Sequence, residues 1–154
     1  MTGDLEFLRR AFRDVPMCHL STLDPAGAPH VAPRWFVWVE EGLFISTRRG
    51  DASWENVVGD PRVSVVIDRG RDWAELTGVR VDGAAGAVAA EHPEIRGVMS
   101  AWHEKYRSML AGDGFERFTE AIPQLGFLRV EPLRVRTWDH AWHERGIAGP
   151  QSRS

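Results

Sequence analysis

The chain has 154 residues, of which 43% are hydrophobic and 27% are charged, and its formal net charge is -3. This length suffices for one domain with a buried core, and the composition is ordinary for a globular protein. Proteins that bind nucleic acid without regard to sequence need many cationic contacts to phosphates, so the acidic balance argues against that class. We expect no nucleic-acid partner.

The sequence gives no indication of a membrane segment or an oxidising compartment. No apolar run approaches the roughly 20 residues that cross a bilayer, and the first residues, MTGDLEFLRR, lack the apolar centre of a signal peptide. The single cysteine, Cys18, cannot form an intrachain disulfide, and its place in an apolar strand favours packing over a role as nucleophile. We expect a cytoplasmic protein.

The first fifty residues predict one helix and then strands. Asp4 is placed to cap a helix in which Leu5, Leu8 and Phe12 share one face. The turn sequence DPAG at 24–27 separates two apolar stretches and predicts an antiparallel hairpin. The strands expected here span residues 17–23, 30–39 and 43–47.

The middle of the chain predicts a short helix between strands. Residues 52–59 suit a helix that ends at Gly59. Residues 62–68 then alternate, with Val63, Val65 and Ile67 on one face. After a polar break at 69–72 the chain continues through 73–76 to a further strand at 79–88, in which Gly83 and Gly86 predict bulges or barrel bending.

Apolar residues return to helical spacing between residues 93 and 122, which predicts a helical insertion broken at the sequence GDG, residues 112–114. A last strand at 127–135 and a polar tail at 141–154 follow. We therefore expect one domain, residues 1–140, that is mainly β with flanking helices. About six antiparallel strands joined by tight turns favour a small barrel over an open sheet.

One cluster of side chains has the chemistry of a phosphate site. Hydroxyl and guanidinium groups gather where a strand ends, and a helix whose first turns carry Ser53 and Asn56 begins a few residues later, so its free N–H groups favour an anion. Asp51 opposes this interpretation because a carboxylate competes for the same donors. The alternative is a solvated strand end. The cluster consists of Ser46, Thr47, Arg48 and Arg49.

Aromatic side chains alternate along the strand at 30–39. Phe36 and Trp38 lie on one face, and Trp35 lies on the other. Core or interface packing explains this pattern, and stacking against a flat ligand explains it as well.

No self-contained catalytic or metal motif is present in the sequence. His140 and His143 lie three residues apart without a third ligand nearby, and no GxSxG elbow or Walker loop occurs. We expect no metal, and the sequence identifies no catalytic residue. An enzyme of this composition would need a cofactor to supply the reactivity.

The run from Cys18 to Val88 resembles the pyridoxamine 5'-phosphate oxidase-like family, whose members bind FMN or the deazaflavin coenzyme F-420. The likeness rests on HLSTLDPAGAPHVAPRWFVW, on LFISTRRGDASWENVVGDPRVSVVID and on VRVDGAAGAV, and FLRVEPLRVRTWD is compatible with it. The resemblance implies a six-stranded antiparallel split β-barrel, the FMN-binding split barrel. It also implies a homodimer with two cofactor sites at the subunit interface.

The resemblance also assigns individual positions. Arg34, Trp35 and Phe36 would run along the cofactor ring system, and Ser46 with Thr47 would meet its ribityl and phosphate groups. Further positions are Asn56 on the helix and Trp73 near the dimer interface. Many relatives place a basic pair where this chain has Asp51 and Ser53, and we expect Arg48 and Arg49 to supply that charge from the other side of the loop.

The function implied is that of a flavin- or deazaflavin-dependent oxidoreductase of the B-type branch. Bound F-420, which is slightly favoured, or FMN would transfer hydride to or from a small organic substrate. The alternative is a non-catalytic flavin- or haem-binding barrel, for which His103, His140 or His143 would be the candidate axial ligand. Neither the substrate nor the direction of the reaction follows from the sequence.

Overall fold

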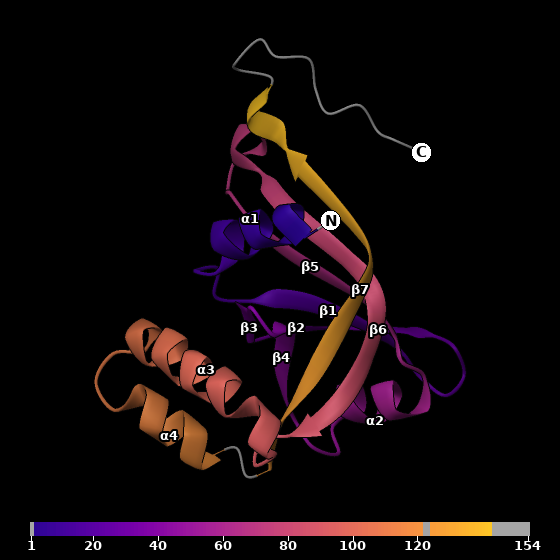
Figure 1. Cartoon of the computed structure of the whole chain (residues 1–154), viewed down its shortest axis with the longest axis vertical. Helices are drawn as coiled ribbons and strands as arrows, with labels where there is room; N and C mark the ends of the chain where they lie inside the picture. The colour runs from indigo at the N-terminus through magenta and orange to yellow at the C-terminus, as the bar shows by residue number, and fades with distance from the viewer. Residues whose placement is uncertain (1, 122–123, 143–154) are drawn as a thin grey trace.

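The computed structural model describes residues 2–121 and 124–142 and shows one curved antiparallel sheet with helices packed around it (Figure 1). Seven strands are present where about six were expected. The strands are β1 (Cys18–Leu23), β2 (Pro29–Arg34), β3 (Phe36–Val39), β4 (Gly42–Arg48), β5 (Arg62–Arg69), β6 (Thr77–Ala89) and β7 (Leu125–Asp139). The α-helices are α1 (Thr2–Phe12), α2 (Ala52–Gly59), α3 (Arg96–Met109) and α4 (Gly114–Ala121), and the short 3-10 helices are η1 (Trp73–Glu75), η2 (Pro93–Ile95) and η3 (His140–Trp142).

The strand order is β2-β1-β5-β6-β7-β4-β3, so β2 and β3, consecutive in the chain, lie at the two ends of the sheet. The prediction of one strand over 30–39 is therefore wrong. Arg34 pairs with Cys18 of β1, whereas Phe36 pairs with Ile45 of β4, so the chain passes at Trp35 from one end of the sheet to the other. This is a split barrel, and Trp35 lies at the split.

The barrel interior is filled by the apolar faces of the strands, and α1 covers it. Val63, Val65 and Ile67 are buried as the alternation predicted, and Leu8 and Phe12 of α1 pack against the same cluster. Cys18 is fully buried there, and this burial raises the pKa of its thiol to about 12. The expectation that Cys18 is a packing residue is confirmed.

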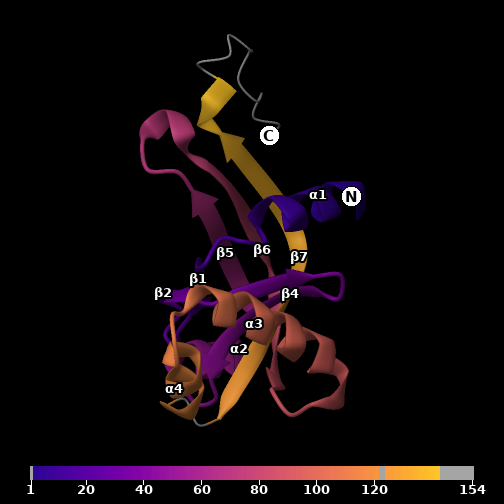
Figure 2. The same cartoon turned by 90° about the vertical axis from the view of Figure 1, so that its left-hand side faces the viewer.

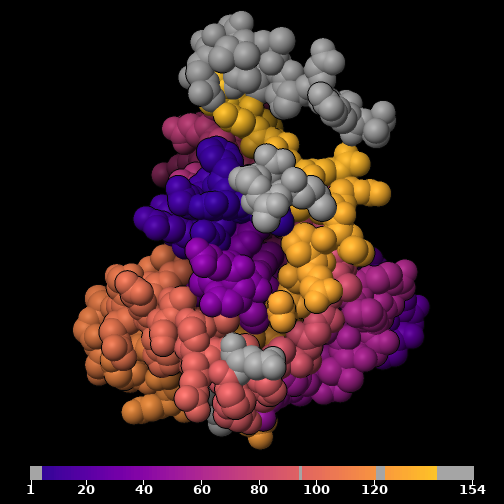
Figure 3. Space-filling view, viewed as in Figure 1, coloured from indigo at the N-terminus to yellow at the C-terminus, as the bar shows by residue number. Residues whose placement is uncertain are grey.

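A second apolar cluster lies between the sheet and the helical insertion. Trp102 and Tyr106 of α3 and Phe115 of α4 are buried against Phe127 of β7. Figure 2 shows α3 and α4 on the part of the sheet that α1 leaves uncovered. In the space-filling view of Figure 3, α1, the hairpin of β3 and β4, and α3 share one face of the molecule.

The long hairpin of β5 and β6 carries a short helix at its tip. Residues Trp73–Glu75 form η1, and Glu75 N donates to Asp72 O at 2.9 Å. A register shift between Asp82 and Gly83 confirms an irregularity at Gly83, where the residue without a pairing partner is Leu133 of β7, whereas no shift occurs at Gly86.

The other elements follow the sequence closely. The helix at 52–59 and the break in the insertion appear where they were predicted, the first helix begins two residues before Asp4, and the last strand extends to Asp139. Within the described ranges no helix combines the length and apolarity that a membrane span requires. Most of the predicted tail, 143–154, lies outside the described residues.

Candidate functional site

The candidate site forms where β4 ends and α2 begins. Gly50 has a φ of 81°, a conformation that glycine adopts without strain, and it turns the chain after Arg48. Asp51 then caps α2, because its Oδ1 accepts a hydrogen bond from Trp54 N at 2.9 Å. Strand end and helix start are thereby held together, as the cluster in the sequence predicted.

A cavity of about 410 Å³ opens beside this junction. We call it the Trp35 cavity. One part of its wall is apolar and another is polar, and it brings together five of the residues expected to bind the cofactor, namely Arg34, Trp35, Ser46, Thr47 and Arg48. The remaining lining residues are Met17, Pro33, Asp51, Phe118 and Leu125.

Asp51 is the centre of the polar wall. Its Oδ2 lies 2.8 Å from a guanidinium nitrogen of Arg34 and accepts a hydrogen bond from Thr47 Oγ1 at 2.7 Å. The same Arg34 nitrogen donates to Ser53 Oγ at 2.8 Å, while Arg34 Nε is buried without a partner among the described residues. Asp51 therefore already occupies two of the donors that an incoming phosphate would use.

The indole of Trp35 is held rigidly in the opposite wall. It stacks on Tyr106 with 4.1 Å between ring centroids and an interplanar angle of 4°, and the ring of Phe118 lies at 4.2 Å. The Tyr106 hydroxyl accepts from Phe36 N at 2.7 Å and lies 2.9 Å from Phe36 O. Burial raises the pKa of Tyr106, so the phenol remains a protonated donor. Because Tyr106 and Phe118 already pack on the indole, a ligand would meet a preformed aromatic wall made of Trp35 and Phe118.

Comparison with known proteins identifies the family. The family model described as pyridoxamine 5'-phosphate oxidase matches residues 5–139. The chain belongs to the pyridoxamine 5'-phosphate oxidase family. The resemblance inferred from the sequence is thus confirmed, together with the mainly β split-barrel fold. No curated protein matches the chain significantly.

Solved structures of similar fold include members with different descriptions. The conserved hypothetical protein Rv2991 from Mycobacterium tuberculosis is 23% identical, with a TM-score of 0.71 over 99% of this chain and 91% of that chain. The haem storage protein HutZ from Vibrio cholerae is 17% identical, with a TM-score of 0.66 over 87% and 92%. A haem-binding protein from Mycobacterium smegmatis is 18% identical, with a TM-score of 0.66 over 86% of this chain and 52% of that chain.

The other residues expected from the family resemblance lie outside the Trp35 cavity. Phe36 is fully buried in the barrel core, and Ser53 is buried behind Arg34. Asn56 donates to Thr22 Oγ1 at 3.0 Å, and Arg49 turns away to Glu91 at 2.8 Å. These four side chains support the site's walls or neighbouring strands and do not line the cavity.

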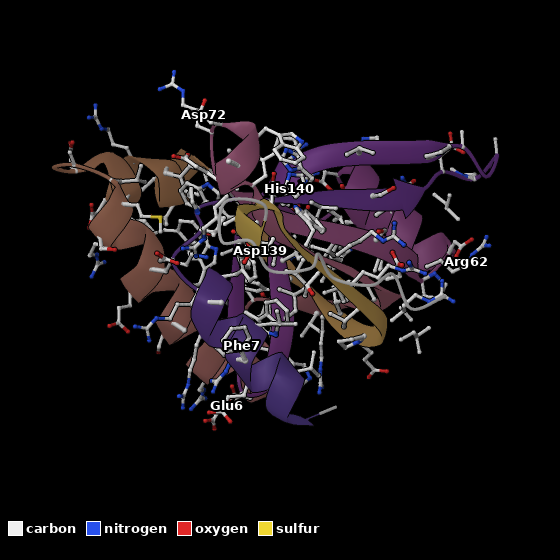
Figure 4. The ribbon with its side chains drawn as sticks, turned by 90° about the horizontal axis from the view of Figure 1, so that it is seen from above. Glu6, Phe7, Arg62, Asp72, Asp139 and His140 are labelled. Carbon is white, nitrogen blue, oxygen red and sulfur yellow. The ribbon has the colours of Figure 1, made fainter. Side chains whose placement is uncertain are left out.

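Trp73 lies at the far end of the long hairpin from the Trp35 cavity. The centroid of its ring is 4.8 Å from that of the His140 ring, and Trp73 as a residue is 57% exposed. Figure 4 looks onto this end of the molecule and labels Asp72, Asp139 and His140 there. Within one chain, Trp73 is thus separate from the cavity.

None of the histidines in the described ranges lines the Trp35 cavity. His103 packs against Phe115 on the insertion, where burial lowers its pKa, and His140 packs against Trp73. His143 lies outside the described residues. In the part of the chain that the structure describes, no three metal-ligating side chains gather.

Sequence reasoning did not find Met17, Phe118, Leu125 and Tyr106 as parts of the site. Phe118 and Tyr106 belong to the helical insertion, and they meet Trp35 only after α3 and α4 fold back over the sheet. Their helical spacing signalled burial, but no local pattern could show which aromatic residue they would meet.

Proposed function

We propose that this chain is a cytoplasmic oxidoreductase that binds FMN or F-420 in the Trp35 cavity and transfers hydride to or from a small organic substrate. The observation that carries the proposal is the cavity itself. It combines the fixed indole of Trp35 with Arg34 at the end of β2 and with two hydroxyl groups and Arg48 at the end of β4. A flat ring system joined to a phosphate requires this combination of an aromatic surface and cationic donors.

The residues present fit such a cofactor. Arg34 Nε is a buried donor without a partner in the described chain, and an anion in the cavity would satisfy it. Arg48 is exposed on the cavity wall and forms no ion pair among the described residues, so its guanidinium is available to a phosphate. When bound, the cofactor would supply the hydride chemistry, while the protein binds it, orients it and excludes water.

The proposal includes a homodimer. The Trp35 cavity is open on one side, and family resemblance assigns the covering of the cofactor ring to a second subunit. Trp73 remains a proposed interface residue, since it is a large exposed aromatic side chain remote from the cavity of its own chain.

A haem- or flavin-binding module without catalysis is the second candidate. Two structures of similar fold are described as haem-storing or haem-binding proteins. Against haem, no histidine of the described ranges lines the cavity, so an axial ligand would have to come from elsewhere.

The experiment that tests the proposal is a parallel fluorescence titration of the protein with FMN and with F-420. Trp35 lines the cavity, so a bound ring system should quench part of the tryptophan emission. Binding of either cofactor at micromolar concentration supports the proposal. Binding of neither, with a Soret absorbance band after addition of haemin, would favour the haem-binding module.

Two single substitutions locate the binding. Arg48→Ala should weaken cofactor binding by about tenfold, the effect of one charge-assisted hydrogen bond. Arg49→Ala is the matched control and should leave the affinity unchanged, because Arg49 already pairs with Glu91. Equal losses of affinity in both variants would contradict the assignment of the cofactor phosphate to Arg48 alone. They would instead support the prediction from the sequence that Arg48 and Arg49 bind the phosphate together.

A further inference from the structure

A second and larger cavity, of about 620 Å³, lies between α1, β3 and α3. We call it the α1–α3 groove. It has a polar side built from the two helices and an apolar side to which β3 contributes, on the face of the molecule that Figure 3 presents. Its lining residues are Arg9, Arg10, Arg13, Asp14, Val37, Trp38, Val39, Ala101, Glu104, Lys105, Ser108 and Met109.

Two of the cations that line the groove have no ion pair within the described chain. Four cationic side chains and two carboxylates line it, but Arg9 and Arg10 are paired with Glu6 and Glu40, which do not line the groove. Asp14, two residues beyond the end of α1, is paired with Arg69 at 2.8 Å. Arg13 is exposed and has no ion pair among the described residues. Arg13 and Lys105 are therefore the cations of the groove that no carboxylate of the described residues pairs with, and they favour an anion there.

Lys105 provides a partly desolvated cation in this groove. Its Nζ donates to Phe36 O at 2.9 Å and lies 3.6 Å from the centroid of the Phe36 ring, and within the described chain no carboxylate forms a salt bridge with it. An ammonium group has three N–H donors, and only one is used here. Burial without a counter-ion is unfavourable unless a ligand supplies the negative charge.

The remaining wall is apolar. Val37, Val39 and Ala101 line it, together with the edge of buried Trp38 and with Met109, which is 40% exposed. A cavity of this volume accommodates a small metabolite, and its mixture of apolar wall and few converging charges is typical of small-molecule sites.

We propose that the α1–α3 groove is a binding site for a small organic anion with an apolar body. The anionic head would bind Arg13 and Lys105, and the body would lie along Val37, Val39 and Met109. The site shares no lining residue with the Trp35 cavity, although Lys105 and Tyr106 both donate to the carbonyl oxygen of Phe36. The proposal does not depend on whether a flavin binds.

The test uses 8-anilinonaphthalene-1-sulfonate, whose sulfonate and naphthalene rings have the proposed chemistry and whose fluorescence rises on binding. Arg13→Gln and Lys105→Met should each weaken its binding by about fivefold or more, as loss of a charge-assisted contact predicts. Arg117→Gln, an exposed arginine on α4, is the charge-matched control and should have no effect. Equal affinity in all four proteins, or an equal loss in Arg117→Gln, would overturn the proposal.

Two further measurements keep the test decisive. Methyl resonances of Val37, Val39 and Ala101 should shift when sodium decanoate is added, whereas those of the exposed Val31 and Leu133 should not. Shifts confined to Met17 and Leu125 would assign the ligand to the Trp35 cavity and overturn the proposal. If Lys105→Met does not fold, the binding measurement on Arg13→Gln alone tests the proposal. A change in the oligomeric mass of Arg13→Gln would assign the groove to a contact between subunits and overturn the proposal.

Discussion

Asp51 shows how much one side chain organises at the residue scale. One carboxylate caps α2 through Trp54 N, accepts the Thr47 hydroxyl and pairs with Arg34, all at distances between 2.7 and 2.9 Å. It thereby occupies the position from which a phosphate would be bound. We infer that Asp51 sets how strongly the Trp35 cavity accepts a negatively charged ligand.

Asp51→Asn should therefore increase the affinity for FMN, by about tenfold, since one like-charge repulsion is removed while an asparagine still caps the helix. The measurement is the tryptophan titration, with thermal unfolding to verify that α2 is retained. Affinity that falls on substitution would show that Asp51 contributes to binding through Arg34.

Lys105 predicts a pH dependence of stability. Burial lowers its pKa in the folded protein from 10.5 to about 8, so between these values the unfolded chain binds more protons and stability rises with pH. Cys18 acts in the opposite direction above pH 9, because burial raises its pKa from 9.0 to about 12. Between pH 8 and 9 only the effect of Lys105 changes the stability, because the effect of Cys18 begins above pH 9.

Urea unfolding at pH 7, 8 and 9 tests this prediction on the wild type and Lys105→Met. The unfolding free energy of the wild type should rise relative to that of the variant between pH 8 and 9, while Cys18 affects both proteins alike. A difference that is constant over this range would place the ammonium in contact with water.

At the scale of elements, β6 is shaped by two glycines with different surroundings. A Cβ on Gly83 would collide with the backbone carbonyl of Glu131, at the point where the register with β7 shifts. A Cβ on Gly86 would meet nothing within 4 Å. The bulge thus depends on the missing side chain at one position only.

Gly83→Ala should destabilise the protein by about 1–3 kcal/mol, the usual cost of forcing extra atoms into a packed site. Gly86→Ala is the matched control in the same strand and should change stability by less than about 1 kcal/mol. Chemical denaturation of both variants measures the difference. Similar stability of the two would mean that β7 shifts without cost.

At the scale of the whole molecule, the split barrel leaves large apolar side chains on its surface. Trp73 is 57% exposed, Val31 62% and Leu133 77%. Scattered exposed apolar residues are ordinary, but these lie on strands and a hairpin tip that a second subunit can reach. They are the candidates for the proposed dimer contact.

Light scattering should therefore give twice the chain mass of 17.3 kDa. Trp73→Ala should shift the equilibrium toward the single chain, and Phe7→Ala, which removes a comparably exposed aromatic residue from α1, should not. A single-chain mass for the wild type at micromolar concentration would contradict the homodimer and the shared cofactor site.

The elements whose signals are local were predictable from the sequence. Alternating Val63, Val65 and Ile67 identified β5, and the helix at 52–59 followed from its apolar spacing and its terminal glycine. The division of residues 30–39 at Trp35 was missed, because each half pairs with a strand distant from the other half.

The sequence by itself determined the family, the mainly β class and the cluster of hydroxyls and arginines at the end of β4, since these depend on contiguous residues. Only the tertiary structure decided which of them face one cavity: Arg48 lines it, Arg49 turns to Glu91, and Phe36 enters the core. It also placed Asp51 among the donors of Arg34 and Thr47, and Tyr106 beneath Trp35. These outcomes depend on contacts between residues far apart in the chain, and such contacts form only when the sheet curls and the insertion packs over it.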